Sequence, residues 1–255
     1  MSTGPALPAR VRRASLSARI SSGIRGFLRA CLSKGYGAIA GLRNGLLVTL
    51  LTAGASAAEP VTVVALGDSL TAGYGLADPS QGLVPVLEGW LKDRGHDVVV
   101  QNAGVSGDTT AGGLARVGWA LGPEADALIV TLGGNDLLRG IDPTASKASL
   151  EGILKEAAAR DLPVLLVAMK APGNFGPEYK AAFDGMYGEL SGQYGTLLAD
   201  DFFGGLRAAG ADPADPASMA AFMQADGIHP NPEGVKLIVE ELGPKVEELL
   251  TKIGS

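Results

Sequence analysis

One serine of this chain directly follows an apolar run and is a candidate nucleophile. Val61–Leu66 is a β-branched run, and Gly67, Asp68 and Ser69 come immediately after it. This pattern is typical of a buried strand that ends by presenting a hydroxyl. A serine hydroxyl is a poor nucleophile until a base removes its proton, so the rest of the sequence must supply that base.

The candidate base is His229, because the only other histidine, His96, lies in a polar segment, Arg94–Asp97. We interpret that segment as a solvated turn between a helix and a strand. Asp226 precedes His229 by three residues in a loop that contains glycine. Its carboxylate could hold the imidazole Nδ1–H and leave Nε2 free to face a serine. A structural alternative stays open here: Asp226 would cap a turn, and His229 would pack on the following helix.

Attack of a serine on an ester or thioester creates an oxyanion, which needs preorganised hydrogen-bond donors. Gly107, within Ser106–Asp108, lets a backbone N–H approach a substrate closely. Asn135, within Gly133–Asp136, has a side-chain amide that can donate. The alternatives are an ordinary turn glycine and a turn-forming Gly-Asn-Asp segment. Both alternatives could hold together only if ordinary turn residues fell by coincidence at the end of each of these strands. The Gly-x-Ser-x-Gly nucleophile elbow of lipases is absent.

Apolar runs that alternate with helical patterns predict the elements that position these residues. The expected strands are Val61–Leu66, Asp97–Gln101, Ala127–Leu132, Val164–Met169 and Thr196–Ala199. The expected helices are Pro79–Arg94, Thr109–Leu121, Thr144–Arg160, Pro177–Tyr194 and Pro232–Lys252. Continuous apolar strands separated by helices indicate an α/β fold with a parallel sheet that is covered on both faces. Ligand sites of such sheets form outside the carboxyl ends of the strands, where Ser69, Gly107 and Asn135 fall.

The first 58 residues are predicted to be a leader that is cleaved off. They contain no Asp or Glu. Their basic residues are Arg10, Arg12, Arg13, Arg19, Arg25, Arg29, Lys34 and Arg43. The apolar run Gly45–Gly54, too short to span a bilayer, and the small residues Ala55–Ala58 complete the pattern of a secretory signal peptide. We expect cleavage after Ala57 or Ala58 and export, to the periplasm or out of the cell. The long basic segment leaves open a start downstream of Met1 or an organelle transit peptide.

Residues 59–255 are expected to form one domain. All 27 Asp and Glu lie there with 13 of the 21 Lys and Arg, which gives this part a net charge of −14. That charge argues against binding to nucleic-acid phosphates or anionic lipid surfaces. The single cysteine, Cys31, lies in the predicted leader, so the domain has no disulfide and no thiol nucleophile. Two histidines without a His-Glu-x-x-His motif exclude a His-rich zinc site.

Four sequence blocks, in this order, resemble those of the SGNH, or GDSL, hydrolases. The blocks are Gly67–Leu70 (Gly-Asp-Ser-Leu), Ser106–Asp108 (Ser-Gly-Asp), Gly133–Asp136 (Gly-Gly-Asn-Asp) and Asp226–Asn231 (Asp-Gly-Ile-His-Pro-Asn). Longer segments look like the branch of exported bacterial esterases described as acyl-CoA thioesterase I, lysophospholipase or arylesterase. These segments are Gly67–Tyr74, Asn102–Thr110, Leu132–Gly140, Ala171–Gly176 and Asp226–Asn231. The resemblance covers nearly all of residues 61–250.

The resemblance implies a flavodoxin-like, three-layer α/β/α sandwich on a parallel five-stranded sheet. It implies Ser69 as the nucleophile, His229 as general base and then general acid, and Asp226 as the residue that orients His229. The oxyanion donors would be the backbone N–H groups of Ser69 and Gly107 and the side-chain amide of Asn135. It also implies no metal or cofactor and a small acyl ester, thioester or lysophospholipid as substrate. We expect a monomer, without stable membrane insertion and without a nucleic-acid partner.

Two alternative functions stay open. The same machinery could act on carbohydrate O-acetyl groups, although the domain is poor in aromatic residues and both Trp90 and Trp119 are expected in the core. A non-catalytic lipid- or ester-binding module is disfavoured, because the serine, aspartate and histidine are all present. The apolar segment Ala217–Gln224 could wall an acyl groove, although core packing is the commoner role of such a stripe. The loop over residues 171–179 could form a mobile lip over the site.

Overall fold

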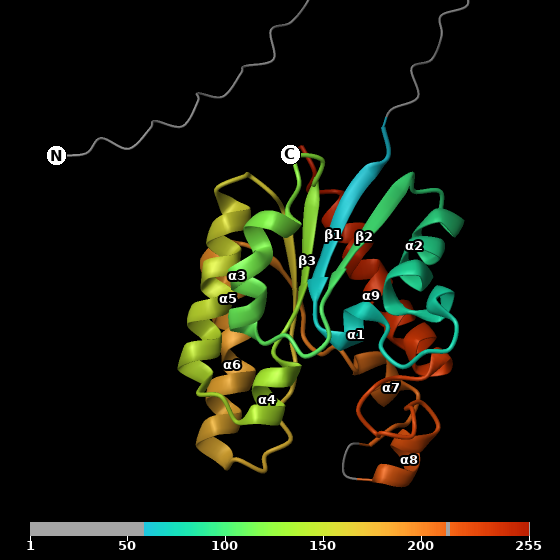
Figure 1. The fold of residues 1–255 in the computed structure, drawn as a ribbon, viewed down its shortest axis with the longest axis vertical. Helices are drawn as coiled ribbons and strands as arrows, with labels where there is room; N and C mark the ends of the chain where they lie inside the picture. The colour runs from blue at the N-terminus through green and yellow to red at the C-terminus, as the bar shows by residue number, and fades with distance from the viewer. Residues whose placement is uncertain (1–58, 213–214, 255) are drawn as a thin grey trace, which may run out of the picture. The chain divides into compact units, whose positions relative to one another are not determined.

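Five parallel strands form one sheet in the order β2-β1-β3-β4-β5 (Figure 1). The computed structural model describes residues 59–212 and 215–254, and the leader predicted for residues 1–58 lies outside them. The strands are β1 (Val61–Gly67), β2 (Val98–Gly104), β3 (Ala127–Thr131), β4 (Val164–Val167) and β5 (Leu197–Ala199). All five predicted strands are therefore present, and only their ends differ from the prediction.

Helices cover both faces of the sheet, which confirms the predicted three-layer α/β/α sandwich (Figure 1). One face carries α3 (Thr110–Ala120), α5 (Pro143–Ala158) and α6 (Pro177–Tyr194). The other face carries α2 (Leu83–Asp93) and α9 (Pro232–Leu250). The short helices are α1 (Ser69–Ala72), η1 (Pro79–Gln81), α4 (Gly134–Arg139), α7 (Gly204–Ala208) and α8 (Pro216–Ala220).

The central strands are buried because helices pack on both of their faces. Every residue of β3 and β4 is buried, as are the last five residues of β1. The edge strand β2 instead begins with alternation, in which Val98 and Val100 are buried and Val99 is exposed. The continuous apolar runs of the sequence thus correspond to strands that are covered on both sides.

Capping side chains fix where two helices next to the candidate site begin. The hydroxyl oxygen of Thr109 accepts from the Gly112 N–H at 3.2 Å at the start of α3. Oδ1 of Asn231 accepts from the N–H groups of Glu233 and Gly234, both at 3.0 Å, at the start of α9. Each cap satisfies N–H groups that have no partner within the helix. The loops that precede α3 and α9 therefore end at defined positions.

One of the two expectations about tryptophans is wrong. Trp90 packs against the core as expected, but Trp119 of α3 is 87% exposed. The buried residues of α3 are Thr110, Gly113, Val117 and Ala120. Trp119 lies two residues beyond Val117, about 200° around the helix, and so it faces away from the sheet. His96 lies between α2 and β2 as expected; its side chain is 35% exposed, and its Nε2 is 2.9 Å from Oε1 of Glu247 in α9.

Candidate active site

The carboxyl ends of three strands bring the predicted site residues to one edge of the sheet (Figure 1). Ser69 begins α1 directly after β1, and Gly107 lies in the turn between β2 and α3. Asn135 is the second residue of α4, which follows β3. His229 lies in the loop that leads into α9. This is the edge at which ligand sites of parallel sheets form.

The hydroxyl of Ser69 lies 2.9 Å from Nε2 of His229, and Nδ1 of that ring lies 2.6 Å from Oδ2 of Asp226. Oδ1 of Asp226 also accepts from the backbone N–H groups of Ile228 at 2.9 Å and His229 at 3.0 Å. These bonds, the one from the His229 ring first, lower the pKa of Asp226 to about 2. An ionised carboxylate only accepts, so Nδ1 of the neutral ring carries the proton and Nε2 presents a lone pair to Ser69.

A short antiparallel bridge and a glutamine hold the loop that carries His229. Met223 pairs with Pro230, and the Gln224 N–H donates to the His229 carbonyl at 2.8 Å. The side-chain amide of Gln224 donates to the carbonyls of Tyr74 at 2.9 Å and Pro230 at 3.0 Å. The Tyr74 ring in turn lies 4.8 Å from the His229 ring, between centroids. These contacts join the histidine loop to the segment that follows α1.

Arg116 of α3 ties the turn that holds Gly107 to the ends of β1 and β2. Its guanidinium donates to Oδ2 of Asp108 at 2.6 Å and to the carbonyls of Ala103 at 2.7 Å and Gly67 at 2.8 Å. Gly107 itself has φ of +85°, a conformation that favours glycine. Sequence reasoning missed Arg116, because a basic residue eight positions beyond Asp108 on an amphipathic helix gives no signal of such a role.

Asn135 faces Asp68 from the start of α4. Nδ2 of Asn135 donates to Oδ2 of Asp68 at 3.1 Å, and Oδ1 of Asp68 accepts from the Leu70 N–H at 3.0 Å. Asp68 is 1% exposed, and desolvation on burial raises the pKa of its carboxyl to about 6. Arg139, at the end of α4, donates to the Gly107 carbonyl at 2.7 Å. Helix α4 is therefore joined both to the end of β1 and to the Gly107 turn.

Asp136, next to Asn135, anchors α4 in the core. Its carboxylate accepts three hydrogen bonds, from the Thr110 N–H at 2.9 Å, the Thr110 hydroxyl at 2.6 Å and the Ser146 hydroxyl at 2.7 Å. All three side chains are buried. A buried carboxylate with several donors is stable in its place, because breaking the set would leave a charge without partners. The backbone that carries Asn135 is thus fixed from α3 and α5.

Two segments with suggested roles near the site pack against other parts of the domain. Residues 217–224 pack on the core through their large apolar side chains, Met219, Phe222 and Met223. Core packing, the commoner alternative, is therefore their observed role. In the loop over residues 171–179, the Tyr179 hydroxyl donates to the Ile141 carbonyl at 2.9 Å. The mobile lip stays a prediction.

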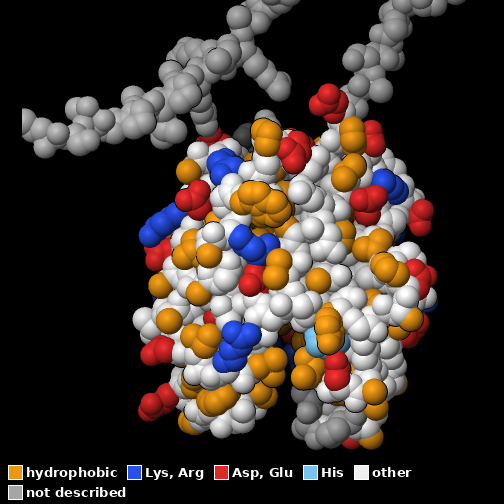
Figure 2. All heavy atoms as spheres, in the orientation of Figure 1, with side chains coloured by type: hydrophobic (Ala, Val, Ile, Leu, Met, Phe, Trp, Pro, Cys, Tyr) orange, Lys and Arg blue, Asp and Glu red, His pale blue; other side chains and the backbone are white. Residues whose placement is uncertain are grey.

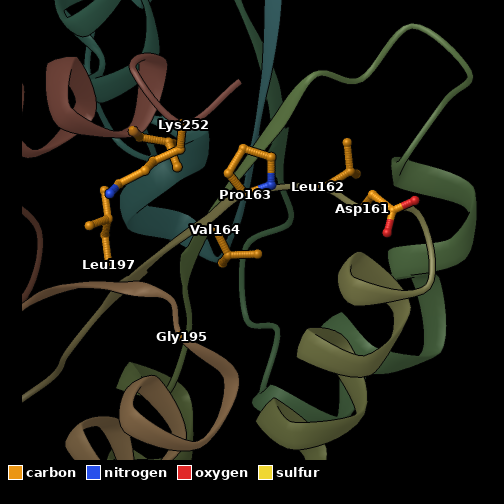
Figure 3. Close-up of a pocket in the computed structure, with 8 residues that line it drawn as sticks. Asp161, Leu162, Pro163, Val164, Gly195, Leu197 and Lys252 are labelled. Atoms are coloured by element: carbon orange, nitrogen blue, oxygen red, sulfur yellow. The ribbon is translucent and has the colours of Figure 1, made fainter. Parts of the chain in front are cut away.

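Of two hollows in the described part of the chain, the smaller adjoins the candidate site residues and the larger does not. A hollow of about 10 Å³ lies beside Ser69 and His229 and has room for about one water molecule. A larger hollow of about 320 Å³ is lined by residues at the amino ends of β4 and β5, including Val164, Leu197 and Lys252 (Figure 3). None of the candidate site residues lines the larger hollow. It lies at the opposite end of the strands from the candidate site.

Comparisons with known proteins agree with the fold. The GDSL-like Lipase/Acylhydrolase family matches residues 65–237. The chain is 40% identical over 210 residues to Esterase TesA of Pseudomonas aeruginosa, and the match covers 82% of this chain and 98% of that protein. It is 32% identical over 206 residues to thioesterase 1/protease 1/lysophospholipase L1 of Escherichia coli K12, covering 80% and 91%. The crystal structure of TesA matches with a TM-score of 0.65 at 39% identity, over 74% of this chain and 99% of that chain. AlinE4, an SGNH-hydrolase family esterase, matches with a TM-score of 0.60 at 40% identity, over 76% and 99%.

The family match, the esterase relatives and the shared α/β/α fold define this protein as a carboxylic ester hydrolase. The chain belongs to the GDSL-like lipase/acylhydrolase family. The resemblance to the SGNH hydrolases and the fold expected from it are therefore confirmed.

Proposed function

We propose that Ser69, His229 and Asp226 are the catalytic triad of a serine esterase. The observation that carries the proposal is the continuous chain from the Ser69 hydroxyl through both ring nitrogens to Asp226, at 2.9 and 2.6 Å. His229 takes the Ser69 proton at Nε2 while Oγ attacks the acyl carbonyl carbon. Ionised Asp226 stabilises the imidazolium that forms. His229 then protonates the leaving alcohol or thiol, and water repeats the attack to release the acid and restore Ser69.

Three donors are proposed for the oxyanion of the tetrahedral intermediates. They are the backbone N–H groups of Ser69 and Gly107 and the side-chain amide of Asn135. Ser69 is the first residue of α1, so its N–H has no partner within the helix. Gly107 lies in a turn that Arg116 and Arg139 hold through Asp108 and the Gly107 carbonyl. The Asn135 amide nitrogen lies 3.1 Å from Oδ2 of Asp68, the residue before Ser69. Preorganised donors of this kind stabilise charge that develops only during the reaction.

Exposed apolar side chains near these residues favour acyl or aryl esters as substrates. Of the seven large hydrophobic side chains that are exposed in the described part of the chain, five belong to segments that carry or adjoin the site: Tyr74, Val105, Leu138, Phe175 and Ile228. The Phe175 ring lies against Gly140 at the end of α4. Figure 2 shows hydrophobic side chains on both sides of a notch at the lower end of the domain.

A substrate that covered these side chains would remove apolar surface from water, which favours binding. We therefore propose a small acyl ester, thioester or lysophospholipid as substrate. The names of the relatives, esterase, thioesterase/lysophospholipase and, for a protein of Vibrio mimicus at 31% identity, arylesterase, support this range.

Hydrolysis of p-nitrophenyl esters from acetate to palmitate tests the proposal, with Ser69→Ala as the matched variant. We expect turnover by the wild-type protein and background rates for the variant, with the same circular dichroism spectrum. A preference for longer chains would support an acyl-binding surface. Turnover of acetate alone would favour a carbohydrate O-acetylesterase. A folded wild-type protein without turnover on any ester would contradict the proposal.

We also propose that residues 1–58 are removed on export and that residues 59–255 act outside the cytoplasm. The support is the basic, then apolar, then Ala-x-Ala order of the sequence. Between residues 59 and 254, positions 213–214 excepted, no helix is long and apolar enough to cross a membrane. The intact mass of the protein from a periplasmic extract tests the proposal. A chain that begins at Ala58 or Glu59 is expected, and an uncleaved cytoplasmic chain would contradict it.

A further inference from the structure

We propose that Asp68 is a positioning residue that sets which end of the Asn135 amide faces the oxyanion. This inference rests on the proposed function, in which Asn135 donates to the tetrahedral intermediate. An asparagine amide carries two N–H donors at one end and a carbonyl oxygen at the other. Only the nitrogen end stabilises an oxyanion, whereas the oxygen end repels it. A rotation of the amide by half a turn would therefore convert a helpful group into a harmful one.

The two carboxylate oxygens of Asp68 have separate partners. Oδ1 accepts from the Leu70 N–H at 3.0 Å and caps α1, while Oδ2 lies 3.1 Å from Nδ2 of Asn135. An ionised carboxylate only accepts hydrogen bonds, so Asn135 must turn its nitrogen toward Asp68. One N–H is used in that bond, and the second N–H of the same nitrogen is left for the oxyanion. Because Asp68 is 1% exposed, water competes little for Oδ2.

The backbone around Asn135 places the residue but does not choose the orientation of its amide. Asp136 is held by Thr110 and Ser146, which fixes the first turn of α4. None of these bonds involves the Asn135 side chain. Gly134 allows the carboxylate to come close, since a Cβ at that position would lie 3.2 Å from Oδ2 of Asp68. The choice between the two ends of the amide is therefore made by the carboxylate.

Protonation of Asp68 would weaken this choice, because a carboxylic acid can also donate to the amide oxygen. Burial raises the pKa of Asp68 to about 6, and the bonds from Leu70 and Asn135 oppose that rise. The charged groups that act on Asp68 are His229, which lowers its pKa, and Asp136, which raises it. Asp68 is therefore ionised at pH 8, and the orientation of Asn135 is most secure there.

A double-mutant cycle on kcat tests the inference. Asp68→Asn and Asp68→Ser both keep a side chain that can cap α1, but neither provides a group that only accepts. Each is combined with Asn135→Ala, and kcat and KM are measured with a p-nitrophenyl ester at pH 8. We expect each Asp68 variant alone to lower kcat about 10- to 100-fold, with KM changed less than about twofold. In the Asn135→Ala background, the same changes should alter kcat less than about threefold, because no amide is left to orient.

Asp142→Asn is the matched control, because Asp142 caps α5 through the same kind of bond, to the Thr144 N–H at 2.8 Å. It should leave kcat unchanged. Equal losses from the Asp68 variants in both backgrounds would overturn the inference, since Asp68 would then act without the amide. An unchanged kcat in Asp68→Ser would overturn it as well.

The same variants separate this inference from the proposed function. If Asn135→Ala lowers kcat but the cycle is additive, the role of Asp68 fails and the oxyanion assignment stands. If Asn135→Ala keeps full kcat while Ser69→Ala is inactive, the oxyanion assignment fails and the inference fails with it. The pH profile adds an independent readout. Asp68→Asn should remove a rise in kcat near pH 6 in the wild-type background but not in the Asn135→Ala background.

Discussion

The ionised carboxylate of Asp68 should destabilise the folded protein at neutral pH, and Asp68→Asn should relieve that effect. Burial raises the pKa of this group to about 6 from its ordinary value of 3.8. The folded state therefore binds the proton more tightly than the unfolded state does. The contribution of Asp68 to stability is then fully favourable below pH 3.8 and is lost as the pH rises through 6. The difference between these two pKa values corresponds to a loss of about 3 kcal/mol in the free energy of unfolding at pH 8.

Urea unfolding of the wild-type protein and Asp68→Asn, at pH 8 and at pH 4, measures this difference. The variant is uncharged and keeps a capping side chain for α1, so it resembles the protonated acid. We expect it to be more stable by about 1–3 kcal/mol at pH 8 and by less than about 1 kcal/mol at pH 4. The lower end of the range at pH 8 allows for amide hydrogen bonds that are weaker than those of a carboxylate.

Asp142→Asn again serves as the control, because it removes a carboxylate from an exposed cap of α5. Its effect should be small at both pH values. A less stable Asp68→Asn protein at pH 8, or a gain in stability of equal size at pH 4, would show that the buried charge of Asp68 does not destabilise the fold. A variant that is more stable but slower would show that the buried charge is retained for function at the expense of stability.

Three further changes test other parts of the site. Gly104→Ala should lower both the thermal midpoint and kcat, because its Cβ would lie 2.4 Å from the backbone nitrogen of Ala72 and would force α1 to move. Wild-type values of both would show that α1 tolerates the shift. Tyr187→Phe should destabilise the fold by about 1–2 kcal/mol in urea unfolding, because the buried hydroxyl donates to the Leu132 carbonyl at 2.9 Å. An unchanged urea midpoint would mean that this carbonyl finds another partner. Asp226→Asn should lower kcat by about 10²- to 10⁴-fold without unfolding the protein, because an amide does not hold the Nδ1–H tautomer of His229 as a carboxylate does. A kcat within about threefold of wild type would remove Asp226 from the triad.

The sheet could be predicted from the sequence because its central strands are buried on both faces. Their residues form continuous apolar runs, and these runs correspond to β1, β3 and β4. The position of Ser69, Gly107 and Asn135 at one edge followed from the same pattern, since parallel strands end together. Asp226 and His229 could be paired because they are only three positions apart, and a tight loop brings such residues into contact.

The contacts that connect the site could not be predicted, because they depend on how separate elements pack. Arg116 reaches the Gly67 carbonyl across 49 positions of sequence, and Asn135 reaches Asp68 across 67. No spacing rule links such pairs before the fold is known. The exposure of Trp119 was missed for a related reason, since residue type suggested the core and only its angle around α3 decides otherwise.

Covalent labelling with a p-nitrophenyl alkylphosphonate, followed by mass spectrometry of the peptides, tests most directly whether Ser69 is the nucleophile. We expect about one phosphonyl group for each protein molecule, attached to Ser69, with loss of esterase activity in proportion to labelling. We also expect that Ser69→Ala, correctly folded, takes up no label. Labelling of a different residue, or equal labelling of the variant, would contradict the assignment of Ser69 as the nucleophile.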